Sequence, residues 1–461
     1  MDTTTPTPPT VLGAYRAGLY ACFTRARAAL FDLCDALATH PDARSFVDLS
    51  PAPCFQRRWP SVYEAWEDGR IDRAALRALF RDAAPRPAAG ARQVRALDSS
   101  PLARPDARTS ADRTLVHGPV AGAVLPPHTA PVRPGWAVST LVVAPPAPRR
   151  WTHILDNARI PSDQTALTLG AAQRAALVPT RAQEKEREET QGEQERPVVL
   201  ADGGDGTAGW VAATADLALD QLGRAAATRV LYRTAPPPTG KAGRSRKDGA
   251  RVKGSDPSTH GAPDVIWTGP DAGGREVTVR CGGGLHRKEC RHVPLTAVCL
   301  TRPAATGATG DPRERWLWWL CGRPVPPLAR VARLYPRRFS SEHGDRFDKQ
   351  DLLWTAPHVR PPEQMERWTD VVAAVHNESG LARARAQAQH LPWEDPPRPL
   401  SPRQVRRARA RLVAREGTPA APPRPRGTSP GRAPGTVVRP APRHPVIRKA
   451  PARRPKRPRA A

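Results

Sequence analysis

The sequence lacks the features that would assign it to a membrane, secreted or zinc-binding class. No apolar run approaches the roughly 18 residues of a transmembrane helix, and residues 1–6 show neither the basic start nor the apolar segment of a secretory signal. The 7 cysteines are an odd number and no two have C-x-x-C spacing, so we expect reduced thiols rather than disulfides. The nearest approach to a metal motif fits no common zinc spacing: Cys281, His286, Cys290 and His292. We therefore expect a cytoplasmic protein without membrane contact.

Lysine and acidic residues are scarce relative to arginine. Arginine outnumbers lysine 64 to 8, and 72 basic residues face 44 acidic ones, a net charge of +28. Such an excess favours a polyanionic partner, most often nucleic acid. Residues 401–461 alone hold 18 Lys and Arg, 13 Pro and a single acid, Glu416. A segment of this kind cannot bury a core, so we predict a basic, proline-rich, largely disordered tail over 391–461, with a short arginine-rich helix at 402–415. It would add salt-sensitive, sequence-independent affinity for nucleic acid.

Hydrophobic periodicity predicts a helical domain at the N-terminus. Apolar residues recur at steps of three, four and seven between Leu12 and Leu37, which predicts one long helix over 11–40. Asp72 is placed to cap a later helix that buries Leu76 and Phe80. We expect residues 1–85 to form this domain.

After a proline-rich linker, the pattern changes to short strands that alternate with helices. Two apolar strands each end on an acid, at Asp98 and at Asp202. An aspartate at a strand end is common turn chemistry. In an α/β sheet, however, reactive groups gather at the carboxyl ends of strands, so these two side chains are also placed to lie together.

A β-rich segment interrupts this α/β pattern. Short strands are predicted within 234–325, including one with three tryptophans, Trp316, Trp318 and Trp319. These indoles can stack on an unpaired base or fill a hydrophobic core, and their sequence leaves both interpretations open. The predicted domains are 1–85, 86–233, 234–325, 326–390 and 391–461.

Four residues after this segment fall on one stripe of a predicted helix, because their spacings match about 100° of rotation per residue. They are Tyr335, Arg338, Glu342 and Lys349. Pro336 favours the first helical position, which places Tyr335 at the helix start. The stripe can be a solvated face of ordinary ion pairs. It can also be a group that holds a phosphate and a metal ion together.

The four-residue spacing resembles the Tyr-Arg-Glu-Lys hallmark of one group of bacterial insertion-sequence transposases, the insertion sequence four-like group. Residues 96–100 and 199–206 are similar to the two aspartate strands of that group. The β-rich segment falls where its members carry an insertion domain. Residues 340–354 also resemble a block found in members from GC-rich genomes. The resemblance extends over roughly 10–385.

This resemblance implies a DDE enzyme on a ribonuclease-H-like α/β fold, a mixed sheet with flanking helices that is interrupted by the β-rich insertion. Asp98, Asp202 and Glu342 would be the catalytic residues and metal ligands. By the same resemblance, DNA phosphates near the scissile bond would be bound by Tyr335, Arg338 and Lys349.

The implied function is DNA transposition, in which element ends are cleaved and their 3′-hydroxyls are joined to target DNA. We hypothesise two Mg²⁺ ions, for which Mn²⁺ can substitute, with Asp98 bridging both and Asp202 and Glu342 each holding one. The expected partners are double-stranded DNA, at element ends and target, and a second copy of the chain in a synaptic homodimer. We expect a nucleoid-associated protein of the cytoplasm.

The sequence departs from the family pattern directly after Asp202. Gly203, Gly204 and Asp205 stand where the group usually has a basic or polar residue followed by aromatics. This departure motivates one alternative, a transposase-derived DNA-binding protein that has lost catalysis. A second alternative is a metal-dependent nuclease on the same fold, which hydrolyses DNA without strand transfer.

Overall fold

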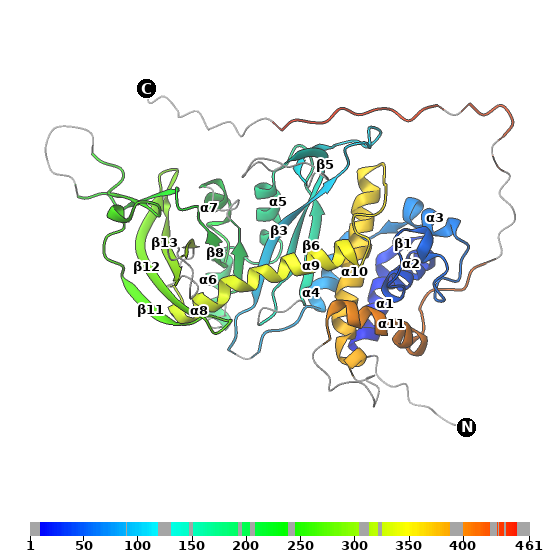
Figure 1. Cartoon of the computed structure of the whole chain (residues 1–461), viewed down its shortest axis with the longest axis horizontal. Coiled ribbons are helices and arrows are strands. Elements are labelled where there is room, and N and C mark those ends of the chain that lie inside the picture. The colour runs from blue at the N-terminus through cyan, green and yellow to red at the C-terminus, as the bar shows by residue number, and fades with distance from the viewer. Residues whose placement is uncertain are drawn as a thin grey trace.

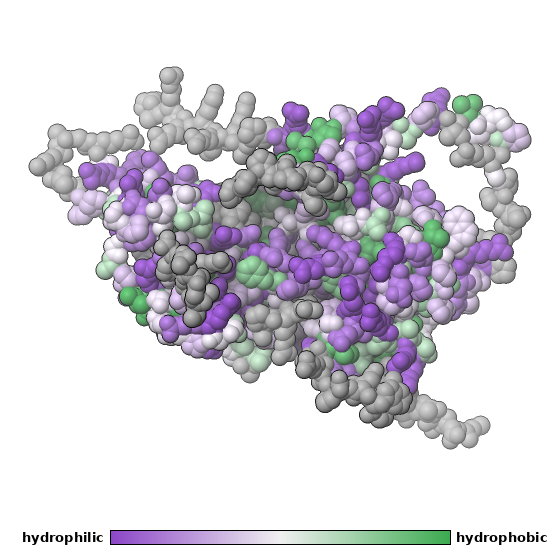
Figure 2. Space-filling model, viewed as in Figure 1, coloured by the Kyte–Doolittle hydropathy of each residue, from purple (hydrophilic) through white to green (hydrophobic). Residues whose placement is uncertain are grey.

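A computed structural model describes residues 10–88, 90–118, 131–146, 151–191, 196–202, 208–237, 245–303, 313–320, 325–387, 400–424, 431, 433–437 and 439–449. A group of N-terminal helices, a central sheet with helices on both faces and a curved β-rich part follow one another across the molecule (Figure 1). On the face shown in Figure 2, hydrophilic residues predominate and apolar ones are scattered. Among the described helices, none combines the length and apolarity needed to cross a bilayer.

Four helices lie in the N-terminal part of the chain, and the first predicted helix is two separate helices. The helices are α1 (Val11–Cys22), α2 (Arg27–Thr39), α3 (Pro60–Asp68) and α4 (Arg73–Asp82). The prediction of one helix over 11–40 is wrong, because Phe23–Arg25 forms a short strand, β1, paired with β2 (Arg70–Ile71). Ala26 then adopts the left-handed region at φ 53°, which reverses the chain into α2. Asp72 caps α4 as predicted, since its side chain accepts a hydrogen bond from the Ala75 amide.

The central sheet is mixed. Its strands are β3 (Val94–Ala103), β4 (Thr114–His117), β5 (Val132–Val143), β6 (His153–Arg159), β7 (Val198–Ala201) and β8 (Asp220–Arg224). The strands β3, β7 and β8 run parallel to one another, whereas β5 pairs antiparallel with β3, β4 and β6. This mixed sheet with flanking helices is consistent with the expected ribonuclease-H-like fold.

Helices cover both faces of this sheet, and alternate residues of β3 face them. Leu97 packs with Trp210 in the hydrophobic cluster beneath α5 (Ala166–Ala175) and α7 (Ala208–Thr214). Val94 and Ala96 belong instead to the main core on the other face. That face also meets α9 (Phe339–Gln350), whose residues bond to Ser100. The remaining described helix of this region is α6 (Arg181–Gln191).

The β-rich segment continues the same sheet. Its strands are β9 (Val230–Arg233), β10 (Arg251–Lys253), β11 (Val265–Pro270), β12 (Glu276–Arg287), β13 (Cys290–Arg302) and β14 (Arg313–Leu320). The strand β14 pairs antiparallel with β8, which joins the segment to the central sheet. Trp318 and Trp319 are 4% and 2% exposed, and a Cβ at Gly223 would overlap the Trp318 ring. These two indoles therefore fill the core.

The stripe residues Tyr335, Arg338, Glu342 and Lys349 lie in a continuous helical stretch that begins before Tyr335. The helix α8 (Leu328–Leu334) is followed by a 3₁₀ turn, η4 (Tyr335–Arg338), and then directly by α9. The prediction that Tyr335 begins the helix is therefore wrong, because Pro336 sits inside a turn that joins two helices. In Figure 1 this stretch runs in yellow across the front of the sheet toward α10 (Pro362–Gln387).

Part of the basic tail is a packed element. The predicted arginine-rich helix is present as α11 (Pro402–Glu416), opened by a Ser401–Gln404 capping box. Arg406 is 1% exposed and donates to the carbonyl oxygens of Leu37, His40 and Pro41 at the end of α2. This helix is therefore bound to the N-terminal domain, and disorder does not describe residues 402–416.

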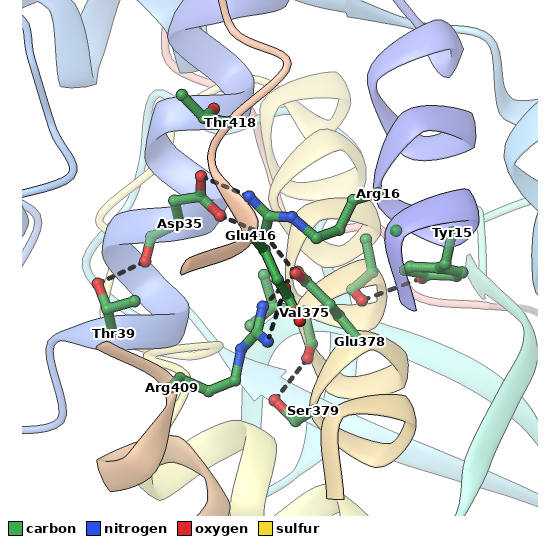
Figure 3. Close-up of polar contacts among 12 residues, drawn as sticks. Tyr15, Arg16, Asp35, Thr39, Val375, Glu378, Ser379, Arg409, Glu416 and Thr418 are labelled. Atoms are coloured by element: carbon green, nitrogen blue, oxygen red, sulfur yellow. Dashed lines mark hydrogen bonds and ion pairs between the residues drawn. The ribbon is translucent and has the colours of Figure 1, made fainter. Parts of the chain in front are cut away.

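A buried ionic network holds α11 in place (Figure 3). Arg16 of α1 bonds to Asp35 of α2 at 2.6 Å and to Glu378 of α10 at 2.5 Å. Arg409 of α11 donates to the same Glu378 carboxylate and lies 3.7 Å from Glu416. The network thus ties α1, α2 and α11 to α10.

Candidate active site

The two aspartates lie at the same level on neighbouring strands. Parallel β3 and β7 are in register at Ala96 and Leu200, so Asp98 and Asp202 each stand two residues beyond a paired position. Neighbouring strands lie about 4.8 Å apart. The prediction that β3 ends at Asp98 is wrong, since the strand runs on to Ala103. The carboxylate is nevertheless accessible, because its neighbour β7 stops at Ala201.

Glu342 completes a group of three carboxylates around one guanidinium. It lies in the first turn of α9, and Arg338 Nη2 donates to its Oε1 at 2.8 Å. The same nitrogen lies 3.9 Å from Asp202 Oδ2, and Nη1 lies 3.5 Å from Asp98 Oδ2. The Asp202 and Glu342 oxygens are therefore no farther apart than the sum of 3.9 Å and 2.8 Å. Segments far apart in sequence are brought together here.

The exposure of these side chains differs sharply. Arg338 is 6% exposed, whereas the side chains of Asp98, Asp202 and Glu342 are 25%, 44% and 47% exposed. The carboxylates thus form the solvent-facing side of the group. Their cation lies beneath them.

Burial and mutual charge both act on the site. Burial raises the pKa of the Asp98 carboxyl above its ordinary value, against the lowering effect of Arg338, and the charges of Asp202 and Glu342 raise it further. Burial alone would lower the pKa of Arg338, but the surrounding carboxylates, Asp202 first, raise it overall. Arg338 is therefore a permanent cation, and the site attracts further positive charge because three acids face one base.

The other two residues of the stripe lie in different surroundings. Tyr335 is 1% exposed, its ring lies 5.3 Å from the Arg315 guanidinium, and burial raises the pKa of its phenol. Lys349 points to β3, where its Nζ donates to Ser100 Oγ at 3.0 Å. The phosphate-binding roles of Tyr335, Arg338 and Lys349 stay predictions.

Two residues beside the site were missed from the sequence. Ser100 stands two positions after Asp98, on the same face of β3, and its hydroxyl donates to the Asp345 carboxylate. Asp345 lies three residues after Glu342 and four before Lys349, on one face of α9. Burial raises the pKa of the Asp345 carboxyl to about 6. The period of two in a strand could have identified Ser100 from Asp98, and the i, i+3 spacing in a helix could have identified Asp345 from Glu342.

The donor set fits divalent cations chemically. Asp202 Oδ1 is buried and has no hydrogen-bond partner among the described residues, and carboxylate oxygens are the ligands that Mg²⁺ and Mn²⁺ prefer. Within the described ranges, no three Asp, Glu, His or Cys side chains are grouped closely enough to hold a metal ion as they stand. At this site Arg338 pairs with each of the three carboxylates.

The other candidate metal site from the sequence, Cys281, His286, Cys290 and His292, does not form a metal-binding group among the described residues. Cys281 and Cys290 are buried free thiols, and His286 bonds to Asp248 at 3.0 Å.

Comparison with known proteins places the chain in a family. The family model described as DDE superfamily endonuclease matches residues 18–288, and the chain belongs to that superfamily. Its nucleases generally depend on divalent metal ions. The matched range contains Asp98 and Asp202 and ends before Glu342.

Among solved structures, the chain is similar to a piggyBac transposase synaptic complex with hairpin DNA. The identity is 9% and the TM-score is 0.39, over 91% of this chain and 77% of that one. No curated protein matches the chain.

Proposed function

We propose that this chain is a DNA transposase that cleaves the ends of an insertion sequence and joins their 3′-hydroxyls to target DNA. The observation that carries the proposal is the convergence of Asp98, Asp202 and Glu342 on Arg338. The matched endonuclease family supports phosphodiester chemistry. The insertion-sequence assignment rests on the stripe from Tyr335 to Lys349.

In the proposed mechanism the carboxylates of Asp98, Asp202 and Glu342 would hold two Mg²⁺ ions. When bound, these ions supply an activated attacking oxygen and stabilise the leaving oxygen in an in-line displacement. Arg338 has two nitrogens that face the carboxylates, and the planar fork of a guanidinium also matches a phosphate. It would therefore hold the scissile phosphate beside the carboxylates. Lys349, kept close to β3 by Ser100, would bind a neighbouring phosphate.

The test is cleavage of the DNA that flanks the gene for this chain. Purified protein is incubated with this DNA and Mg²⁺, and nicked and joined products are separated on a gel. We expect Glu342→Gln to remove both products while folding stays intact, since this side chain is 47% exposed. Glu363→Gln, the same change at an exposed residue of α10, is the matched control. Cleavage by Glu342→Gln at the wild-type rate would contradict the assignment.

Two other activities are separable in the same assay. Nicked DNA without joined product indicates a metal-dependent nuclease. DNA binding without cleavage in Mg²⁺ or Mn²⁺ indicates a transposase-derived binding protein. The sequence departure that motivates the latter, Gly203 to Asp205, lies outside the described residues.

A further inference from the structure

A cavity of about 320 Å³ lies at the other end of β3 from Ala103. Its walls come from the linker after α4, the start of β3, the end of β5, the start of β6, η4 and α10. We propose that it binds one unpaired nucleotide of the DNA strand on which the neighbouring carboxylates act. This inference rests on the proposed function only for the identity of the ligand as DNA.

The charge of the cavity is of one sign. Its described lining includes four arginines and no acid: Arg86, Arg92, Arg337 and Arg383. Arg92 is paired with Asp220. Arg337 is held by carbonyl oxygens only, 2.6 Å from Pro145 O and 2.8 Å from Ala144 O. Burial lowers its pKa to about 10, so it stays charged near neutral pH without a carboxylate partner among the described residues. A phosphate supplies the missing anion.

The walls between the arginines are apolar. Val94, Val143 and Pro145 line the cavity together with Trp151, and the Arg383 guanidinium lies 5.5 Å from the Trp151 ring. His153 adds no charge, since burial lowers its pKa to about 4. Apolar and aromatic walls beside a cationic rim suit a base joined to a phosphate better than a free phosphate. The volume is at the lower end of the roughly 300–1,000 Å³ of small-ligand sites, which fits one nucleotide and excludes a duplex.

Two neighbouring residues connect this cavity to the candidate active site. In η4, Arg338 faces the three carboxylates while Arg337 faces the cavity. Val94 of the cavity precedes Asp98 by four residues on the same face of β3, a distance of roughly 13 Å along the strand. This separation is within the span of a few nucleotides of an extended DNA strand. Because only an unpaired base can enter, the cavity would recognise a frayed or single-stranded DNA end.

The test measures binding in EDTA, so that it does not depend on catalysis. Full-length protein is titrated by fluorescence anisotropy against a blunt duplex, the same duplex with a three-nucleotide single-stranded tail, and a tailed duplex with abasic tail positions. We expect wild type to prefer the normal tail over the blunt end by about tenfold, the scale of one stacked base. Abasic positions should remove that preference.

Variants of cavity residues test whether the preference for tailed DNA arises at the cavity. Arg86→Gln combined with Arg337→Gln should bring the tailed and blunt duplexes to within about twofold, whereas Arg333→Gln, the same change at an exposed residue of α8, should retain the preference. Ala91→Trp, at an exposed lining residue, blocks the cavity without removing a charge and should act like the double variant.

Equal binding of tailed and blunt DNA by wild type, or a preference that survives Ala91→Trp, would overturn the proposal. Binding that ignores abasic positions would overturn it as well, because the cavity would then read phosphate alone. These results are independent of Glu342→Gln. If Glu342→Gln loses cleavage but wild type shows no tail preference, the transposase assignment stands and the nucleotide-binding cavity is refuted. If wild type shows the tail preference but Glu342→Gln still cleaves, only the transposase assignment is refuted.

Discussion

Two of the charged clusters among the described residues differ in exposure and charge balance: one lies at the candidate active site, the other where α1, α2, α10 and α11 meet. The buried network in Figure 3 sets two arginines against three acids, and its side chains are at most 10% exposed. The candidate site sets Arg338 alone against three acids that are 25% to 47% exposed. The first cluster nearly balances its charge. The second leaves an excess of negative charge at the surface.

The difference indicates separate roles. A buried ion pair tolerates little change, because the loss of one partner leaves an uncompensated charge in a medium of low dielectric. It therefore holds helices together. Half-exposed carboxylates keep contact with water and can exchange one cation for another at small cost. An unbalanced group of this kind is suited to binding metal ions.

The largest effect is expected from Asp98→Asn, which removes the central carboxylate of the unbalanced cluster. Cleavage should fall by about a thousandfold or more, the scale of losing a main electrostatic contribution to catalysis. Binding of Mn²⁺, followed by electron paramagnetic resonance of the free ion, should weaken together with it. Asp106→Asn, the same change at an exposed acid, is the control, and wild-type Mn²⁺ affinity in Asp98→Asn would refute the metal site.

Glu378→Gln removes one acid from the buried network of Arg16, Asp35, Glu378, Arg409 and Glu416. It leaves Arg16 and Arg409 with one acid fewer, so we expect the free energy of unfolding to fall by about 3–5 kcal/mol. Urea denaturation measures this change. Glu314→Gln, which breaks the half-exposed pair with Arg280, should cost less than about 1 kcal/mol. A loss no greater than that of the control would show that the network is not structural.

Arg338→Gln separates the two roles of the central arginine. Its guanidinium competes with metal ions for the same carboxylate oxygens, so the variant should bind Mn²⁺ about tenfold tighter, or about 1.4 kcal/mol, in the absence of DNA. Cleavage should nevertheless be lost. Arg337→Gln, whose side chain bonds to backbone carbonyls only, should leave Mn²⁺ affinity unchanged. Unchanged affinity in Arg338→Gln would mean that the arginine and the metal ions use different oxygens.

The smallest effect concerns Asp345, the fourth acid beside the site. The folded protein raises the pKa of this carboxyl to about 6 from an ordinary 3.8, so between these values the folded state binds more protons than the unfolded one. Stability from this group is therefore present at low pH and is lost as the pH rises from about 4 to 6. Urea titrations across this range should show wild type losing stability relative to Asp345→Asn. Parallel curves would contradict the raised pKa.

Local patterns predicted much of the candidate site. Strand alternation placed Asp98 on a strand and Asp202 directly after one, and helical spacing placed Glu342 on a helix, because these periodicities follow from backbone geometry alone. Ser100 and Asp345 were within reach of the same rules. The break at Ala26 was not, because a left-handed residue other than glycine has no clear local signal and is held by the pairing of β1 with β2.

The basic tail shows where composition misleads. Arg406 and Arg409 belong to a segment with one acid, which predicts exposure, yet both are fully buried against α2 and α10. Their partners, the carbonyls that end α2 and the carboxylate of Glu378, lie far away in the sequence. No local pattern could have paired them.

Charge excess, the absence of a membrane-spanning run and the order of the three acids follow from the residues themselves, since composition and spacing are properties of the chain. The meeting of those acids on Arg338 depends on folding, because strand register aligns Asp98 with Asp202 and the packing of α9 on β3 adds Glu342. The same packing decides which charges are balanced and which remain free to bind. Electrostatic energy depends on distance and dielectric, and both are set only when the core closes around them.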